Sequence, residues 1–344
     1  MRITTRMMTT RYTSSLNNLS SGLNQLNYQI SSGRSFIKAS ENTSAAISAF
    51  QLRRDLSKSE GYQKNISFAQ DTLSNAESSL MNINEMVQTV NDRVLQGING
   101  TMNTENRKIV AQELRAIQDQ LFQSLNATSS GNYVFGGTET EAKPFSLNAA
   151  GSLLYKGINL DEIATLPGNA DIENKLKKDS LFIDIGLNLK FDSASSNTLD
   201  SSTAFNLAIP GISFTGSGTT TLAGYTSAAP APNNLYSLIG AIASEFESAN
   251  YSRSNVDALL GHFQNRSQDV MMTVSEIGSK SSYLEFMSNR LDSESANMLK
   301  RQTEVEYADP AKTIIDFKSQ EMAYNAALQM GAKLIQPSIF DFMR

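Results

Sequence analysis

The sequence predicts a mainly α-helical protein: an elongated bundle of long, heptad-patterned helices that the amino-terminal and carboxyl-terminal halves build together, with a small β domain inserted between them. Three observations support this fold class. Apolar residues recur at alternating steps of four and three near both ends of the chain, which is the spacing of a coiled-coil seam. Between residues 143 and 233 the apolar residues alternate at period two, as they do in strands. The 344 residues include neither Cys nor Trp, and the abundance of Ser, Asn, Thr and Gln suits a surface-rich, elongated molecule.

The first predicted helix runs from about Thr4 to Ser32, and Gly33 supplies a left-handed cap after it. One face carries an apolar stripe at heptad spacing, while the opposite face consists of Ser, Asn and Gln. The stripe is formed by Tyr12, Leu16, Leu19, Leu23, Leu26 and Ile30. Because a single helix cannot bury its own stripe, the pattern predicts a partner helix.

The second predicted helix has the most regular seam in the sequence. Thr43 is its expected N-cap and it extends to about Gln96, so at 1.5 Å per residue it is roughly 80 Å long. Its seam consists of Tyr62, Ile66, Ala69, Leu73, Ala76, Leu80, Ile83, Val87, Val90 and Val94. Thr104 is the expected cap of a third helix, which a short connection makes antiparallel to the second. That helix carries Val110, Leu114, Ile117, Leu121 and Leu125 on one face.

Short strands are predicted in the middle of the chain. Residues 132–137 form one such strand, bounded by glycines. Apolar and polar residues alternate from Leu181 to Phe191, which predicts one strand or two around Gly186. The alternation then continues through Phe205, Leu207, Ile209, Ile212 and Phe214. Ser, Thr, Gly and Asn fill the turns between these segments, so we predict a small β domain.

The carboxyl-terminal part returns to helix. A helix from Leu235 to Phe246 is followed by a long one from about Ser254 to Ala308. The apolar residues of the long helix recur every seven positions, at Phe263, Val270, Ile277, Leu284, Leu291, Met298 and Val305. Asp309 is expected to cap a terminal helix that begins at Pro310 and ends before Pro337. The stripe of this last helix consists of Ile314, Phe317, Tyr324, Leu328 and Ile335, with Glu321 and Gly331 as weak positions.

Helices before the β insert are expected to pack on helices after it, which predicts three domains. Residues 1–42 with 306–344 form a terminal coiled-coil domain, residues 43–142 with 234–305 form a helical rod domain, and residues 143–233 form the inserted β domain. From the heptads alone, a monomeric helical bundle that buries every stripe internally is an equally good interpretation.

Composition excludes several classes of function. A net charge of -5 spread over the chain provides no basic patch for nucleic acid. No segment approaches the ~18 consecutive apolar residues of a membrane span, and the first residues lack the apolar core of a cleavable signal peptide. We therefore expect no membrane insertion and, if the protein is exported, another export route. Without cysteine there are no disulfides and no thiolate metal sites.

Catalytic chemistry has little support in the sequence. The only histidine is His262, on a helix face between Leu259 and Phe263. Asp and Glu do not cluster at metal-ligand spacing. We expect no enzyme activity, no cofactor and no metal. An enzyme on this scaffold would need its site in residues 143–233, which lack His and Cys but retain Asp and Glu for acid-base chemistry.

Both ends of the chain carry motifs of a known family. The start Met1-Arg2-Ile3-Thr4, the segment 23–36 (LNQLNYQISSGRSF) and Lys38 to Asn42 resemble the amino terminus of the flagellin superfamily. The carboxyl end from Glu304 to Arg344 is similar to its C-terminal helix. Within that superfamily, the first four residues, residues 131–145 (GNYVFGGTETEAKPF) and Tyr155-Lys156-Gly157 resemble the hook-filament junction proteins. The resemblance fades in residues 193–232.

The resemblance implies a structural subunit of the bacterial flagellum that is secreted by type III export and contributes to motility. It implies a polymer ring of identical subunits between another hook-associated junction protein and filament flagellin, with the terminal domain on the inner tube. The expected assembly interface is Leu16, Leu19, Leu23, Leu26, Ile30, Ile314, Phe317, Tyr324, Leu328 and Ile335. The export apparatus and an export chaperone on the C-terminal helix are further implied partners. The alternatives are filament flagellin itself and a secreted enzyme with flagellin-like ends.

Overall fold

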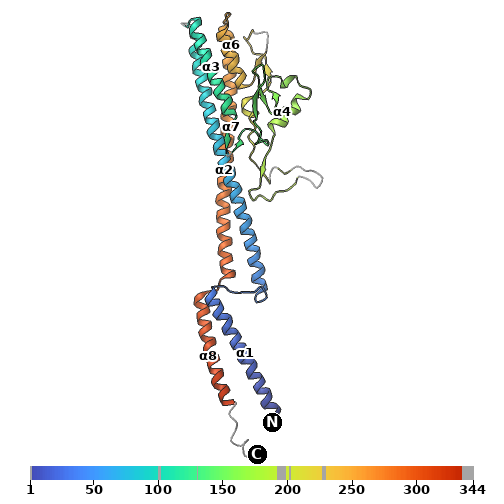
Figure 1. Cartoon of the computed structure of the whole chain (residues 1–344), viewed down its shortest axis with the longest axis vertical. Helices are drawn as coiled ribbons and strands as arrows, with labels where there is room; N and C mark the ends of the chain where they lie inside the picture. Colours follow the sequence, from blue (N-terminus) through green and yellow to red (C-terminus); the bar gives the residue numbers. More distant parts are fainter. Residues whose placement is uncertain are drawn as a thin grey trace, which may run out of the picture. The chain divides into compact units, whose positions relative to one another are not determined.

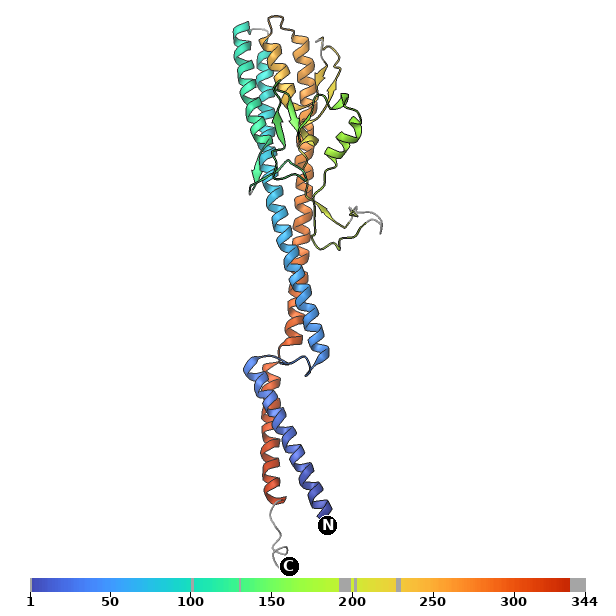
Figure 2. The same cartoon turned by 45° about the vertical axis from the view of Figure 1, so that its right-hand side comes forward.

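A computed structural model describes residues 2–99, 102–129, 131–191, 199–200, 203–226 and 230–334 of the chain. The chain divides into two compact units, Met1–Glu60 with Leu291–Arg344 and Gly61–Arg290. The terminal unit therefore combines the two ends of the sequence, as the paired stripes predict. Long helices and a few small antiparallel sheets make up the described residues (Figures 1 and 2). This confirms the predicted fold class of a mainly α protein with a small β insert.

Four helices provide the frame of the unit Gly61–Arg290. They are α2 (Thr43–Ile98), α3 (Thr104–Leu125), α6 (Leu235–Glu247) and α7 (Arg253–Glu306). In Figures 1 and 2, α3 lies beside α6 and α2 runs beside α7. The predicted seams form the core, because Leu73, Leu80 and Leu284 are fully buried. At the edge of this core the side-chain amide of Gln264 donates a hydrogen bond of 2.6 Å to Asn91 Oδ1 and joins α7 to α2.

The helix caps differ from the prediction by one residue. Asn103, not Thr104, caps α3, since its Oδ1 accepts a hydrogen bond of 2.8 Å from the backbone N–H of Asn106. Similarly, Asn42 Oδ1 accepts a hydrogen bond of 3.0 Å from the backbone N–H of Ala45 at the start of α2. The predictions of Thr104 and Thr43 as caps are wrong. The first N–H groups of a helix have no partner within the helix, and the asparagine before each threonine is an equal or better acceptor for them.

The described residues of the insert and of the segment just before it form four small antiparallel sheets. Strands β1 (Thr128–Ser129) and β2 (Asn132–Tyr133) pair, and β3 (Phe145–Leu147), β4 (Leu153–Tyr155) and β5 (Ile158–Asn159) form a three-stranded sheet. Strand β6 (Phe182–Ile183) pairs with β7 (Phe205–Asn206), and β8 (Thr219–Thr220) pairs with β9 (Ala231–Pro232).

The predicted strands of the insert are too long. Only Phe182–Ile183 of the segment 181–191 form a strand, because Gly186 and Asn188 adopt positive φ angles of 88° and 59° and turn the chain. The alternation at Ile212 and Phe214 belongs to a short helix, α5 (Ile212–Thr215), and not to a strand. The insert also contains two elements that were not predicted, η1 (Ile163–Thr165) and α4 (Asn169–Lys177).

Aromatic residues form the core of the insert. The rings of Phe135 and Phe214 meet edge to face with centroids 5.0 Å apart, and those of Phe145 and Tyr155 are also 5.0 Å apart. The buried Tyr155 hydroxyl donates a hydrogen bond of 3.1 Å to the carbonyl of Phe135. Gly211 leaves room for this cluster, since a Cβ there would collide with the ring of Phe145. The core of the insert thus begins at Phe135, before the predicted boundary at residue 143.

The terminal unit is built on α1 (Arg2–Ser32) and α8 (Pro310–Leu334), with the first part of α2 and the last part of α7. Gly33 follows α1 with φ 70°, which confirms the predicted left-handed cap. Asp309 caps α8, since its Oδ1 accepts a hydrogen bond of 2.9 Å from the N–H of Ala311. The chain after α1 pairs with the chain before α8 through Ala308 N–H to Gly33 O at 3.0 Å.

Candidate assembly interface

The two terminal helices pack against each other as an antiparallel pair (Figures 1 and 2). Tyr12 on α1 lies against Gly331 on α8, and its hydroxyl donates a hydrogen bond of 3.0 Å to the carbonyl of Ala327. In the opposite sense, Gln320 on α8 lies against Gly22 on α1. Each helix therefore presents a glycine to a large side chain of the other. A glycine inside a helix costs about 0.5–1 kcal/mol of stability relative to Ala. Here the missing side chain allows the two helices to approach closely, which explains a glycine at both positions.

The predicted interface residues differ in how far the pair buries them. Leu16, Leu19, Leu23, Leu26, Phe317 and Tyr324 are half-buried. Ile30, Ile314 and Leu328 are 41%, 49% and 43% exposed. Ile335 lies outside the described residues. The structure thus brings the middle of both stripes together and leaves three of the predicted positions at the edge of the contact.

Sequence reasoning missed two features of this pair. The α8 surface against α1 includes Gln320, Ala327 and Gly331, of which only Gly331 lies on the predicted stripe. The second feature is an apolar stripe elsewhere on α8, where Ile315, Met322 and Met330 are 68%, 67% and 64% exposed. Their spacing of seven and eight residues was the signal that could have revealed it.

An ion pair between the exposed Arg53 and the buried Glu306 supports the segment that joins α7 to α8. Arg53 Nε and Nη2 contact the two carboxylate oxygens of Glu306 at 2.7 and 2.5 Å, and Gln302 Nε2 donates to Oε1 at 3.2 Å. The hydrogen bond from Arg53 lowers the pKa of the Glu306 carboxyl, although burial opposes this effect. The carboxylate is therefore charged and fully paired, and the backbone N–H of Ser35 is bonded to the Glu306 carbonyl at 2.8 Å.

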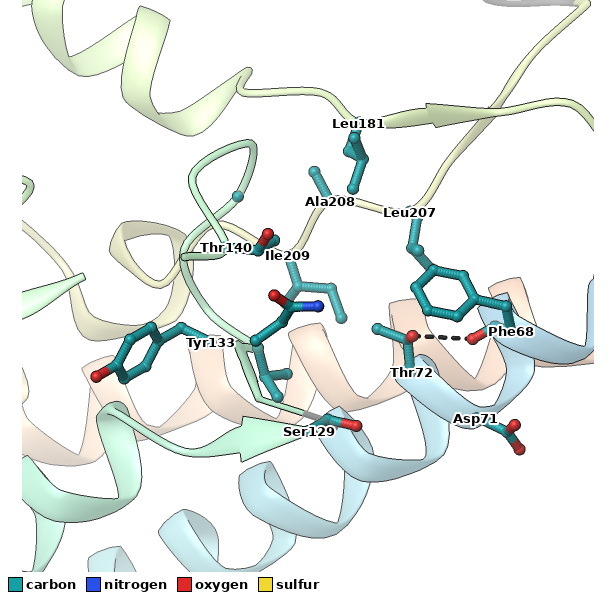
Figure 3. Close-up of a pocket in the computed structure, with 13 residues that line it drawn as sticks. Phe68, Asp71, Thr72, Ser129, Tyr133, Thr140, Leu181, Leu207, Ala208 and Ile209 are labelled. Carbon is teal, nitrogen blue, oxygen red and sulfur yellow. Dashed lines mark hydrogen bonds between the residues drawn. The ribbon is translucent and has the colours of Figure 1, made fainter. Parts of the chain in front are cut away.

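An apolar cavity of about 150 Å³ lies between α2 and the insert in the unit Gly61–Arg290 (Figure 3). Its walls include the side chains of Phe68, Leu207 and Ile209. The Thr72 hydroxyl donates a hydrogen bond of 2.8 Å to the carbonyl of Phe68. The residues that line the cavity include one carboxylate, Asp71, and neither His nor Lys. Its titratable lining side chains are Asp71 and Tyr133, and Figure 3 shows both directed away from the apolar walls.

His262 is held by a contact with the side chain of Asn233. One ring nitrogen lies 2.8 Å from Asn233 Oδ1, and partial burial together with the nearby Arg266 lowers the pKa of its imidazole. Among the described residues, no group of three or more His, Cys, Asp or Glu side chains is arranged to hold a metal ion. None of the helices in the described part of the chain combines the length and apolarity of a membrane span.

Comparison with known proteins identifies the class. Residues 3–140, which include most of α1 and all of α2 and α3, match the family model of the bacterial flagellin N-terminal helical region. The chain therefore carries a flagellin N-terminal helical region, which confirms the predicted resemblance.

The individual relatives narrow this class. The chain is 32% identical over 152 residues to flagellar hook-associated protein 3 of Salmonella typhimurium, a match that covers 44% of this chain and 48% of the relative. It is 28% identical over 147 residues to the protein of the same name from Escherichia coli, covering 42% and 46%. Each match spans about half the length of these curated relatives. Both relatives carry the name flagellar hook-associated protein 3.

Solved structures share the fold. One described as a flagellar hook-associated protein of Vibrio parahaemolyticus superposes with a TM-score of 0.58 at 21% identity, covering 78% of this chain and all of that one (100%). The flagellar junction protein of Legionella pneumophila superposes with a TM-score of 0.53 at 12% identity, covering 77% and 100%. At these identities the likeness establishes the fold alone.

Proposed function

We propose that the chain is a structural subunit of the bacterial flagellum that forms the junction between hook and filament by polymerising through its terminal helices. The single observation that carries this proposal is the pair α1–α8, in which no described apolar side chain is buried although both helices carry apolar stripes. A helix pair with unburied stripes gains stability when further helices cover them. The similarity to proteins named flagellar hook-associated protein 3 supports the junction position.

The proposed interface consists of the stripe residues predicted above, with Leu16, Leu19 and Leu23 on α1 and Phe317 and Tyr324 on α8 at its centre. The proposed domain division also follows the prediction: a terminal coiled-coil domain, a helical rod domain and the β insert. The compact units divide the chain within α2 and α7, at residues 60/61 and 290/291. The proposal assigns assembly to the terminal domain.

The proposed partners are identical subunits, another hook-associated protein on the hook side and flagellin on the filament side. The proposed location is the outside of the cell, reached through the flagellar export apparatus with the help of a chaperone that binds the C-terminal helix. We propose no catalytic activity, since the curated proteins similar to this chain are named as flagellar parts.

Three substitutions test the proposal. Leu23→Glu and Leu328→Glu each place a carboxylate in a terminal stripe, whereas Leu291→Glu places one at a side chain that is only 4% exposed. Burial of an unpaired carboxylate costs several kcal/mol. We expect Leu291→Glu to lower the melting temperature of the monomer strongly. The two terminal variants should change it much less, because Leu23 is half-buried and Leu328 is exposed, yet fail to incorporate at the hook tip.

The measurements are thermal unfolding of the purified monomers by circular dichroism and immunogold labelling of flagella from cells that depend on each variant. A terminal variant that melts as low as Leu291→Glu would assign the stripes to the monomer core and contradict the proposal. Wild-type label along the whole filament, and not in a band at the hook end, would identify filament flagellin instead.

A further inference from the structure

A small groove lies in the terminal unit beside the segment that follows α1. It has a volume of about 110 Å³, and its apolar wall includes Phe36, Ile37 and Phe50. Ile37 is 46% and Phe50 is 64% exposed. Arg34, Arg53 and Glu306 line the same groove. It therefore combines exposed apolar side chains with charged groups, as protein-binding surfaces do.

The charges of the groove are not balanced. Two arginines and one glutamate line it, and Arg53 binds both carboxylate oxygens of Glu306. The backbone N–H of Arg34 donates to Ser32 Oγ at 3.2 Å. Within the described residues the Arg34 guanidinium makes no hydrogen bond or salt bridge, although it acts electrostatically on the Glu306 carboxylate. It is the second positive charge beside that one carboxylate. An arginine in this position can bind a carboxylate in bidentate geometry.

The complementary features occur on the first turns of α8 in the same chain. Ile314 and Ile315 are 49% and 68% exposed, and the next residue, Asp316, is also exposed. Among the described residues Asp316 has no ion-pair partner, whereas Lys318, two positions on, contacts Glu321 at 2.8 Å. The side of α8 against α1 is already occupied by Tyr12 at Gly331. A second surface of α8 therefore presents an isoleucine beside an unpaired carboxylate.

We propose that Ile315 and Asp316 of one copy dock into the groove of a second copy, with the isoleucine against Phe50 and Ile37 and the carboxylate on Arg34. Each of the two surfaces combines exposed apolar side chains with a charge, and the two charges are opposite, which favours a second copy as the occupant. The contact joins two different surfaces and is therefore heterologous, the kind that extends from copy to copy into a ring or a helical polymer. The inference rests on the proposed function and specifies one contact of the polymer.

Charge reversal tests the ion pair. Arg34→Glu and Asp316→Lys each place like charges together, so we expect each to raise the protein concentration needed for assembly by about tenfold or more. The double variant Arg34→Glu with Asp316→Lys restores the attraction and should assemble close to wild type. Lys300→Glu, a charge reversal at an exposed residue of the same unit, is the matched control and should have little effect. Assembly is measured by light scattering and sedimentation of the full chain.

Cysteine crosslinking tests the direction of the contact, and the absence of native cysteine makes it specific. Under mild oxidation, Phe50→Cys with Ile315→Cys should produce a ladder of covalent oligomers, whereas each single variant should produce at most dimers. Wild type that assembles with no effect of the charge reversals and no ladder would overturn this contact and leave the proposed function intact. Wild type that neither assembles nor reaches the flagellum would overturn the proposed function itself.

Discussion

The helical core of the unit Gly61–Arg290 and the terminal pair α1–α8 carry the same kind of apolar pattern but reach different burial. In the core, Leu73, Leu80 and Leu284 are fully buried. On α1 and α8, by contrast, the described stripe leucines are half-buried or exposed. The reason is the number of neighbours. Residues of α2 and α7 are covered by each other, by α3 and α6 and by the insert, whereas the half-buried apolar side chains of α1 and α8 lie between two helices only.

This difference teaches that a heptad stripe does not by itself say whether its partner lies in the same molecule. Burial of apolar area contributes about 25 cal/mol per Å², and ordering each residue of a helix costs about 1–2 kcal/mol of backbone entropy. A half-buried pair therefore has little stability of its own, and each additional neighbour has a large effect on it. Assembly of copies is the way in which this chain can supply such neighbours.

The largest expected effect is in local opening. Helices with few buried contacts open with free energies near zero, whereas core helices open close to the global free energy of unfolding. We expect limited proteolysis of the monomer to remove material within about the first 40 and last 40 residues, and hydrogen exchange in α1 and α8 to be faster by orders of magnitude than in residues 66–94 of α2. Mass spectrometry of the fragments and of deuterium uptake measures both. Equal protection from exchange in the terminal pair and in residues 66–94 would show that the two regions do not differ in stability.

A medium effect is expected at the ion pair of the terminal unit. Arg53→Ala leaves the buried Glu306 carboxylate, whose side chain is 7% exposed, without its main donor. Loss of a hydrogen bond to a charged group costs about 1–3 kcal/mol. Urea unfolding should show this loss in the variant, and Arg54→Ala is the matched control, since Arg54 is exposed and contacts only the exposed Asp55.

The pH dependence of this pair has a definite sign. The pKa of Glu306 is below its ordinary value of 4.5 in the folded state, so the stability it contributes is fully present above pH 4.5. It is lost as the pH falls through the folded pKa. Glu306→Gln should lose this part of the acid sensitivity. An unchanged acid midpoint in Glu306→Gln would show that other carboxylates govern it.

The smallest effect concerns the glycines. Gly331→Ala places a methyl group against the Tyr12 hydroxyl, and overpacking typically costs about 1–3 kcal/mol, part of which the better helix propensity of Ala offsets. We expect a net loss of about 1 kcal/mol. Gly61→Ala on α2 meets no atom within 4 Å and should instead stabilise by about 0.5–1 kcal/mol. Because α1 and α8 open before the rest of the chain unfolds, hydrogen exchange in these two helices measures Gly331→Ala, whereas thermal unfolding measures Gly61→Ala. Opposite signs would confirm the close contact, and the same sign would refute it.

The sequence by itself determined the helices and their core. The step of four and three places Leu73 and Leu80 on one face of α2, and the seven-residue repeat places Leu284 on one face of α7; in the structure all three are buried. Gly33 and Asp309 also acted as predicted at the ends of α1 and α8. Periodicity and caps are properties of neighbouring residues along one chain, so they can be recognised without the fold.

Only the tertiary structure decided what the stripes and the insert do. The strand pattern at Ile212 and Phe214 became α5, since residues in the insert are held by the aromatic core around Phe135 and not by a long ladder. On α8, Ala327 and not Leu328 faces α1, because Tyr12 of α1 packs against Gly331 and bonds to the carbonyl of Ala327. Because that side of α8 faces α1, Ile315 and the unpaired Asp316 are left exposed. Burial is a property of what lies across from a residue, and that is set by packing between distant segments.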